Sequence, residues 1–259
     1  MKSKSVIYFL MLFLIGGISS SYADDFSDAI LKAKKDFKSA NDKSDQDGMI
    51  KARGEFERIL QLKKNQWLVD YYLADVDFAL SYISMQSNDK DNIKKYTESS
   101  LQLLDKSTDM KDDFAEAYIL KMAVNGNRWM YEPDKMNDIL AKTNEATDKA
   151  KKLEPDNPRF YVISGMNLYY TPETFGGGAS AAQPLFEKAY ELFQNRKEKD
   201  DTYPSWGYDL SAGMLAMCYI KQDKLDDAKK YIDKGLEIDP ESGFILNVVK
   251  KDYDDKIKK

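Results

Sequence analysis

One short phrase occurs five times along the chain, and it constrains the fold more than any other feature. Each copy has an acidic residue first, usually a small residue third and a large aliphatic residue sixth. The copies begin at Glu57, Glu98, Asp148, Glu187 and Asp233, at intervals of 41, 50, 39 and 46 residues. Self-similarity at spacings of this size is typical of stacked helical repeats. We therefore expect a repeated helical unit rather than a single irregular core.

Two of the copies run directly into an acidic residue followed by proline, Glu154-Pro155 and Asp239-Pro240. Proline lacks the backbone N–H that a helix needs, and it pushes the preceding residue out of helical conformation. We therefore predict that helices end near Leu153 and Ile238, and that each phrase marks the end of the second helix of a hairpin.

Between the copies lie segments that are apolar around much of the circumference of a helix. They are Trp67–Met85, Phe114–Val124, Arg159–Tyr170 and Tyr208–Lys221. Broad apolar faces on a helix indicate neighbours on both sides, as in stacked hairpins. No run alternates with a period of two for long enough to predict a strand. The pattern predicts five helical hairpins followed by a C-terminal helix that caps the stack.

The last predicted hairpin has the small, large and proline positions that close helix crossings require. These positions are Leu215, Ala216, Tyr219, Ala228, Ile232, Gly235 and Pro240. The hairpin resembles the tetratricopeptide family, although Thr143 replaces the expected alanine in the third hairpin. The resemblance implies an all-α fold for residues 24–259, a right-handed superhelical solenoid of about five tetratricopeptide-like hairpins plus a C-terminal capping helix.

A narrower resemblance covers roughly residues 110 to 245. It rests on four stretches: Phe114–Tyr118, Asp156–Tyr161, Tyr169–Gly178 and Tyr203–Gly207. Together they are similar to a group of exported bacterial tetratricopeptide proteins of uncharacterised function. This likeness implies a tetratricopeptide-like fold and an exported protein. It implies no catalytic activity.

The N-terminus has the three parts of a secretory signal peptide. Lys2 and Lys4 precede an apolar run from Val6 to Ile18, and small residues lead to Ala23. The apolar run is too short to span a hydrocarbon core of about 30 Å, which needs roughly 20 residues. We predict a signal peptide over residues 1–23, cleavage after Ala23, and a mature chain that is periplasmic or secreted and does not span the membrane. An uncleaved membrane anchor is the alternative.

Composition argues against most enzyme classes and against nucleic acid. The chain has no histidine and a single cysteine, Cys218, so Ser-His-Asp triads, Cys-His pairs and histidine zinc sites are excluded. The formal charge of −5 does not suit a nucleic-acid partner.

Ser87–Lys90 matches a Ser-x-x-Lys spacing, but we interpret it as a turn before a helix. Asp42–Gly48 lacks the ligand positions of an EF-hand loop, so we expect no enzyme activity, metal or cofactor.

A partner site is expected on the concave face of the stack, where solenoids bind extended peptides or small ligands. Gly176–Gly178 is interpreted either as a hairpin connector or, with Phe175 and Trp206, as one wall of a ligand pocket. The candidate binding residues are Tyr118, Asn125, Arg128, Trp129, Met166, Tyr169, Tyr170, Phe175, Gly177, Trp206 and Lys221.

These residues lead to two functional hypotheses. The first is a non-catalytic binding or scaffold module of the bacterial envelope that holds a protein segment. The alternative is a small-molecule-binding accessory protein of an uptake system, with a pocket near the Gly176–Gly178 loop. An open groove favours a peptide, and an enclosed pocket of roughly 300–1,000 Å³ favours a small ligand.

Overall fold

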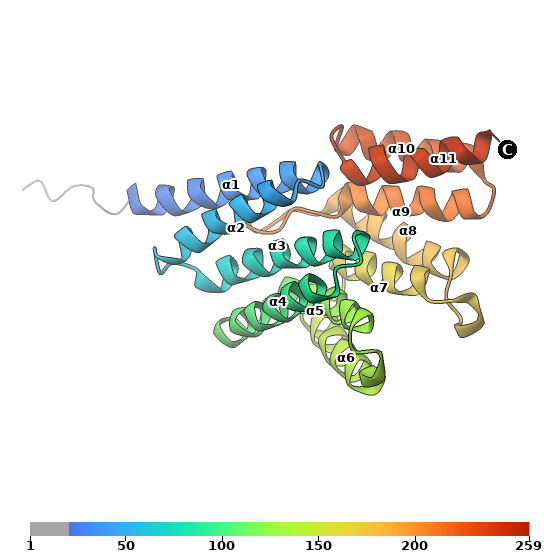
Figure 1. Ribbon diagram of the computed structural model, residues 1–259. Coiled ribbons are helices and arrows are strands. Elements are labelled where there is room, and N and C mark those ends of the chain that lie inside the picture. Colours follow the sequence, from blue (N-terminus) through green and yellow to red (C-terminus); the bar gives the residue numbers. More distant parts are fainter. Residues whose placement is uncertain (1–20, 259) are drawn as a thin grey trace, which may run out of the picture.

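The fold consists of helices connected by short segments (Figure 1). The structure, a computed structural model, describes residues 21–258. The helices are α1 (Ser21–Asp42), α2 (Gln46–Leu60), α3 (Gln66–Gln86), α4 (Lys90–Met110), α5 (Ala115–Asn127), α6 (Met136–Leu153), α7 (Pro158–Tyr170), α8 (Ala179–Asn195), α9 (Tyr208–Lys221), α10 (Leu225–Ile238) and α11 (Lys250–Ile257). Short 3-10 segments cover Arg128–Met130, Pro133–Lys135 and Glu173–Phe175, and a π-helical segment, Ile245–Val249, leads into α11. The described residues include no strand.

Successive helices pair into hairpins, which confirms the predicted repeat. The pairs are α1 with α2, α3 with α4, α5 with α6, α7 with α8, and α9 with α10, and α11 packs on the last pair. We call α1, α3, α5, α7 and α9 the first helices and their partners the second helices. Adjacent first helices contact one another. They therefore form one continuous face of the stack.

The predicted helix boundaries are also confirmed. Helix α6 ends at Leu153 and α10 ends at Ile238, each just before an acid-proline pair. The four apolar segments between the repeated phrases correspond to α3, α5, α7 and α9. Local sequence signals therefore determine where these helices begin and end.

Small residues bring the last hairpin and the C-terminal helix together. Ala216 and Ala228 are fully buried. A Cβ atom on Gly235 would lie 2.3 Å from the Cδ1 atom of Ile245, so a larger residue there would displace the Ile245 side chain. The small positions of the tetratricopeptide pattern thus have the packing role that the sequence predicted.

The two ends of the stack are in contact with each other. Lys38 on α1 pairs with Asp239 at 2.5 Å, just after α10. A Cβ atom on Gly243 would lie 1.9 Å from the carbonyl oxygen of Asp42, the last residue of α1. The first hairpin therefore packs against the connection between α10 and the C-terminal helix.

The predicted signal peptide falls mainly on residues 1–20, which lie outside the described residues. Within residues 21–258, no helix has the length and apolar character needed to cross a membrane.

Candidate functional site

The connection between α8 and α9, residues 196–207, lies across the face formed by the first helices (Figure 1). We call it the strap. Lys34 on α1 donates hydrogen bonds to the carbonyl oxygens of Asp201 at 2.6 Å and Tyr203 at 2.5 Å. Tyr72 on α3 donates to the carbonyl oxygen of Thr202 at 2.5 Å. The strap is thus held by side chains from helices far away in the sequence.

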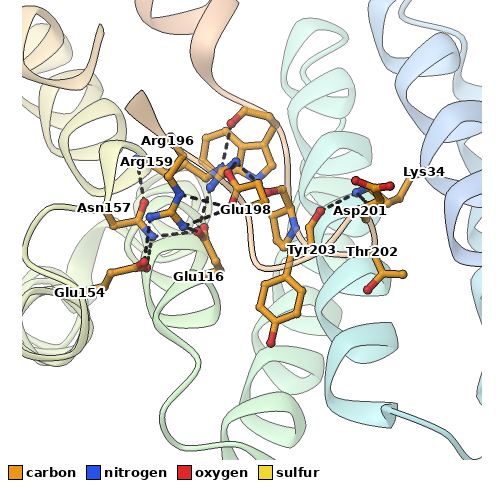
Figure 2. A network of polar contacts seen from close by, with 12 residues as sticks. Lys34, Glu116, Glu154, Asn157, Arg159, Arg196, Glu198, Asp201, Thr202 and Tyr203 are labelled. Atoms are coloured by element: carbon orange, nitrogen blue, oxygen red, sulfur yellow. Dashed lines mark hydrogen bonds and ion pairs between the residues drawn. The ribbon is translucent and has the colours of Figure 1, made fainter. Parts of the chain in front are cut away.

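Arg159 is the centre of this network (Figure 2). Its side chain is fully buried at the start of α7 and donates to the carbonyl oxygens of Pro204 at 2.7 Å and Trp206 at 2.8 Å. It also pairs with Glu116 on α5 at 2.9 Å and with Glu198 of the strap at 2.7 Å. Burial alone would lower the pKa of Arg159, but these two carboxylates outweigh it and raise the pKa.

The local sequence explains how Arg159 reaches this position. Asn157 caps α7, since its side chain accepts a hydrogen bond from the backbone N–H of Arg159. Pro158 follows in the first helical position, where its missing N–H costs nothing. The same Asn157 donates to Glu116 at 2.8 Å, so the cap of α7 and the acid on α5 are fixed together.

Glu116 accepts hydrogen bonds through one carboxylate oxygen only, within the described part of the chain. Its Oε1 atom receives Asn157, Arg159 and Arg196, while its buried Oε2 atom has no partner among residues 21–258. Desolvation raises the pKa of Glu116, although Arg159 opposes this effect. The opposite holds at Glu198: burial acts to raise its pKa, but Arg159 and Arg196 hold it below the usual value. These charges lie under and within the strap.

Side chains of α1, α3 and α7 thus donate to the carbonyl oxygens of strap residues 201, 202, 203, 204 and 206. Tyr72 and Arg159 lie in the N-terminal halves of α3 and α7, whereas Lys34 lies in the C-terminal half of α1. On α3 and α7, the strap therefore occupies the N-terminal half of the face on which a partner was expected.

Helical periodicity places on the remaining half of this face residues one to three turns further along α3 and α7, together with residues of α5, which lies between them. We call these residues the uncovered face: Asp75, Phe78, Ala79 and Tyr82 on α3, Ala123, Gly126 and Asn127 on α5, and Met166 and Tyr170 on α7. Tyr82 is 52 % exposed and Tyr170 is 64 % exposed. Desolvation nevertheless raises the pKa of Tyr170, and Tyr82 adds to this shift. Tyr170 is thus exposed to solvent and at the same time close to other helices. This combination is expected for a side chain in a concave surface.

Three predicted site residues, Tyr118, Asn125 and Arg128, come together in a different place. They line a hollow of about 230 Å³ between α4, α5 and α6, together with Lys121 and Glu145. This hollow lies between two second helices. Arg128 is already paired there with Glu132 at 2.9 Å. A separate hollow of about 390 Å³ is lined by α4 side chains, so it is open surface.

Two further predicted site residues, Met166 and Tyr170, belong to the uncovered face, and the others are scattered. Trp129, at 37 % exposed, and Phe175, at 80 % exposed, lie at the turns of the third and fourth hairpins. Met166 and Tyr169 pack against the apolar core, and Lys221 is exposed at the end of α9. Trp206 belongs to the strap and donates to the Tyr71 hydroxyl at 2.9 Å.

The structure corrects the expectation that Phe175 and Trp206 form one wall. Trp206 contacts Arg159 at the start of α7, whereas Phe175 lies beyond its end. The 13 residues of α7 separate them, a length of about 20 Å at 1.5 Å per residue.

The three glycines of the predicted loop all have local backbone roles. Gly176 and Gly178 adopt positive φ angles of 83° and 95°, which disfavour other residues. A Cβ atom on Gly177 would lie 2.1 Å from the carbonyl oxygen of Thr171. Gly178 also donates to the carbonyl oxygen of Leu168 at 2.9 Å. This geometry accounts for the loop as a hairpin connector.

The sequence analysis did not predict the strap or the hydrogen bonds that its carbonyl oxygens accept from the first helices. Its one visible signal is Arg159, a charged residue directly after the Asn-Pro start of an otherwise apolar helix. No group of acidic or cysteine side chains in residues 21–258 is arranged to hold a metal ion.

The antiparallel helix pairs and the first-helix face define a tetratricopeptide-like helical-repeat fold. Among solved structures, the chain is similar to the HusA haemophore from Porphyromonas gingivalis, with a TM-score of 0.62 and 21 % identity over 80 % of this chain and 96 % of that one. It is also similar to TTC0263, a thermophilic TPR protein of Thermus thermophilus, with a TM-score of 0.56 and 13 % identity over 90 % and 100 % of the two chains. No family model matches the sequence, and no curated protein matches it.

Proposed function

We propose that the protein is a non-catalytic binding module that holds a protein segment on the uncovered face. The observation that carries this proposal is the strap. Side chains of the first helices donate to five of its carbonyl oxygens. Backbone carbonyls are present in every peptide, so the same face of the stack suits an irregular segment of another protein.

Tyr82 and Tyr170 are the expected anchors of such a segment. Both are exposed, they come from α3 and α7, and Gly126 on α5 lies between these helices. A Cβ atom on Gly126 would meet no atom within 4 Å, so there is space at this position. Tyrosine side chains bury large apolar areas at binding surfaces and still hydrogen-bond through the hydroxyl group.

An array of synthetic 12-residue peptides, probed with the mature chain, tests this proposal. Peptides that bind are then titrated by fluorescence anisotropy against a Tyr82→Ala/Tyr170→Ala double variant. We expect this variant to keep its melting temperature and to lose at least tenfold in affinity. Ile50→Ala removes an exposed side chain of α2 and should bind like the wild type. Equal affinity in the double variant would overturn the proposal.

A tetrapyrrole is the second candidate ligand, because the fold extends over 96 % of the HusA haemophore. On this alternative the protein is a small-molecule-binding accessory of an uptake system. The exposed rings of Tyr82 and Tyr170 suit a flat apolar ligand, and Phe175 lies just beyond them at the Gly176–Gly178 loop. Titration with haemin and with metal-free protoporphyrin should shift the Soret band. The same double variant should abolish that shift if the uncovered face holds the ligand.

We further propose that the protein is exported and that residues 24–259 form the mature repeat domain. The three-part leader supports this. Mass spectrometry of the protein from an envelope fraction should give an N-terminus at Asp24. A full-length chain retained in the membrane would contradict cleavage.

A further inference from the structure

The uncovered face contains a carboxylate that the fold leaves without a partner. Asp75 lies one helical turn after Tyr71 and Tyr72, next to the covered half of the face. It is half-buried and has no hydrogen bond or ion pair within residues 21–258. Asp77, two residues further along, is instead paired with Arg53 at 2.6 Å and with the Ser99 hydroxyl at 2.6 Å. Asp75 is thus the acidic residue of the uncovered face that has no partner among residues 21–258.

Among the described residues, the cation that acts on Asp75 is Arg159, which is not free to pair with it. The charged groups that act on it are Arg159 on α7 and Glu116 on α5, and the Tyr71 and Tyr72 hydroxyl groups lie nearby on α3. Arg159 is already committed to two carboxylates and two carbonyl oxygens. Desolvation raises the pKa of Asp75 to about 7; Arg159 opposes this shift and Glu116 adds to it. A partly desolvated carboxylate of this kind is stabilised when a cation pairs with it.

We propose that Asp75 binds a lysine or arginine side chain of the partner, so that the segment held on the uncovered face is basic. Phe78 and Tyr82 follow at one and two turns along α3, on the same side of the helix. They can pack against the aliphatic part of such a side chain, and an aromatic face also attracts the cation itself. The formal charge of −5 of the chain favours the approach of a basic segment.

This inference rests on the proposed peptide-binding function, and variants of α3 separate the two. Asp75→Asn keeps the shape of the side chain and removes its charge. Asp70→Asn is the matched control, because Asp70 is buried on the same helix and likewise has no hydrogen bond or ion pair among the described residues. Asp70 differs in that it faces Lys106 on α4, away from the uncovered face.

The experiment uses the same array of synthetic 12-residue peptides. With the wild type and Asp70→Asn, we expect bound peptides to be enriched in Lys and Arg over Asp and Glu. Asp75→Asn should lose this enrichment. For one bound basic peptide, we expect Asp75→Asn to weaken binding about tenfold, which corresponds to about 1.4 kcal/mol. Acetylation of the critical lysine in that peptide should weaken binding to the wild type equally and leave Asp75→Asn unaffected.

Two results would overturn the inference in different ways. Bound peptides without a basic preference, or a preference that survives in Asp75→Asn, would exclude Asp75 as the anchor while the binding function stands. No peptide binding by the wild type would remove the proposed function and the inference with it.

A third readout is independent of the array: wild-type affinity for the basic peptide should fall as the pH is lowered through 7, because Asp75 gains a proton. Asp75→Asn should not show that dependence.

Discussion

Arg159 and Glu116 form an ion pair of 2.9 Å in which both side chains are almost completely buried. The two residues lie on α7 and α5, and the strap covers them. A buried pair of this kind contributes little if both charges are replaced together, but the loss of one partner leaves the other charge unpaired. The strap and the first helices therefore depend on each other through this contact.

The first prediction concerns Arg159→Met. This variant leaves Glu116 buried without its main counter-charge and removes the donor to Pro204 and Trp206. We expect a loss of about 3–5 kcal/mol in the free energy of unfolding. Urea unfolding followed by circular dichroism measures it. Lys94→Met, which removes an exposed lysine on α4, should change stability by less than about 0.5 kcal/mol. A small effect of Arg159→Met would show that the strap is not held by this residue.

The second prediction is a pH dependence at Asp75. Its pKa is raised from 3.8 to about 7 in the folded protein, so the folded state binds more protons than the unfolded state between these values. Stability is therefore lost as the pH rises through this window. Asp75→Asn carries no such charge and should be more stable than the wild type at pH 8, by on the order of 2 kcal/mol.

The difference between Asp75→Asn and the wild type should shrink as the pH approaches 4. Urea midpoints at pH 5 and pH 8 measure it. Asp77→Asn is the contrasting variant, since Asp77 is paired with Arg53 and its loss should destabilise the protein at pH 8. A constant difference for Asp75→Asn at both pH values would mean that Asp75 is not desolvated.

The third prediction tests the small-residue packing of the last hairpin. Ala228→Leu inserts three carbon atoms at a fully buried position between α9 and α10. We expect a loss of about 1–3 kcal/mol through overpacking. Lys229→Leu, at the neighbouring exposed position, should stay within about 0.5 kcal/mol of the wild type in the same urea titration. A neutral Ala228→Leu would contradict the helix register.

The fourth prediction compares two glycines. Gly177→Ala should destabilise by about 1–3 kcal/mol, because its Cβ atom would meet the Thr171 carbonyl oxygen at 2.1 Å. Gly126→Ala should stabilise by about 0.5–1 kcal/mol, since the position is helical and open. Thermal unfolding of both variants measures the difference. A tolerated Gly177→Ala would reopen the question of why three glycines follow one another.

The fold could be predicted because its signals are local. The boundaries at Leu153 and Ile238 follow from prolines a few residues away, and the buried Ala228 and Gly235 follow from spacing within one hairpin. Each hairpin carries its own pattern, so the sequence of a segment is enough to place its helices. The contacts between neighbouring hairpins repeat the same arrangement.

The site could be predicted only in part, because its contacts join distant residues. Lys34 and Tyr203 are 169 positions apart, and no periodicity links them. Tyr170 could be named as a candidate because an aromatic residue on a first helix is a local signal. Asp75 was missed because an aspartate within an apolar helix looks the same whether it has a partner, as Asp77 does, or not. Only the packed arrangement distinguishes these two acids.

The contact between α1 and the connection after α10 has a consequence for how such a chain can change its length. Linear repeat arrays commonly grow or shrink by duplicating or losing a unit, because each unit touches only its neighbours. Here Lys38 and Asp239 join the first and last hairpins at 2.5 Å, 201 positions apart. An inserted or deleted hairpin would change the distance between the two ends and break this contact. The number of hairpins is thus part of the fold itself, and variation in this protein is expected in its connections rather than in its repeat count.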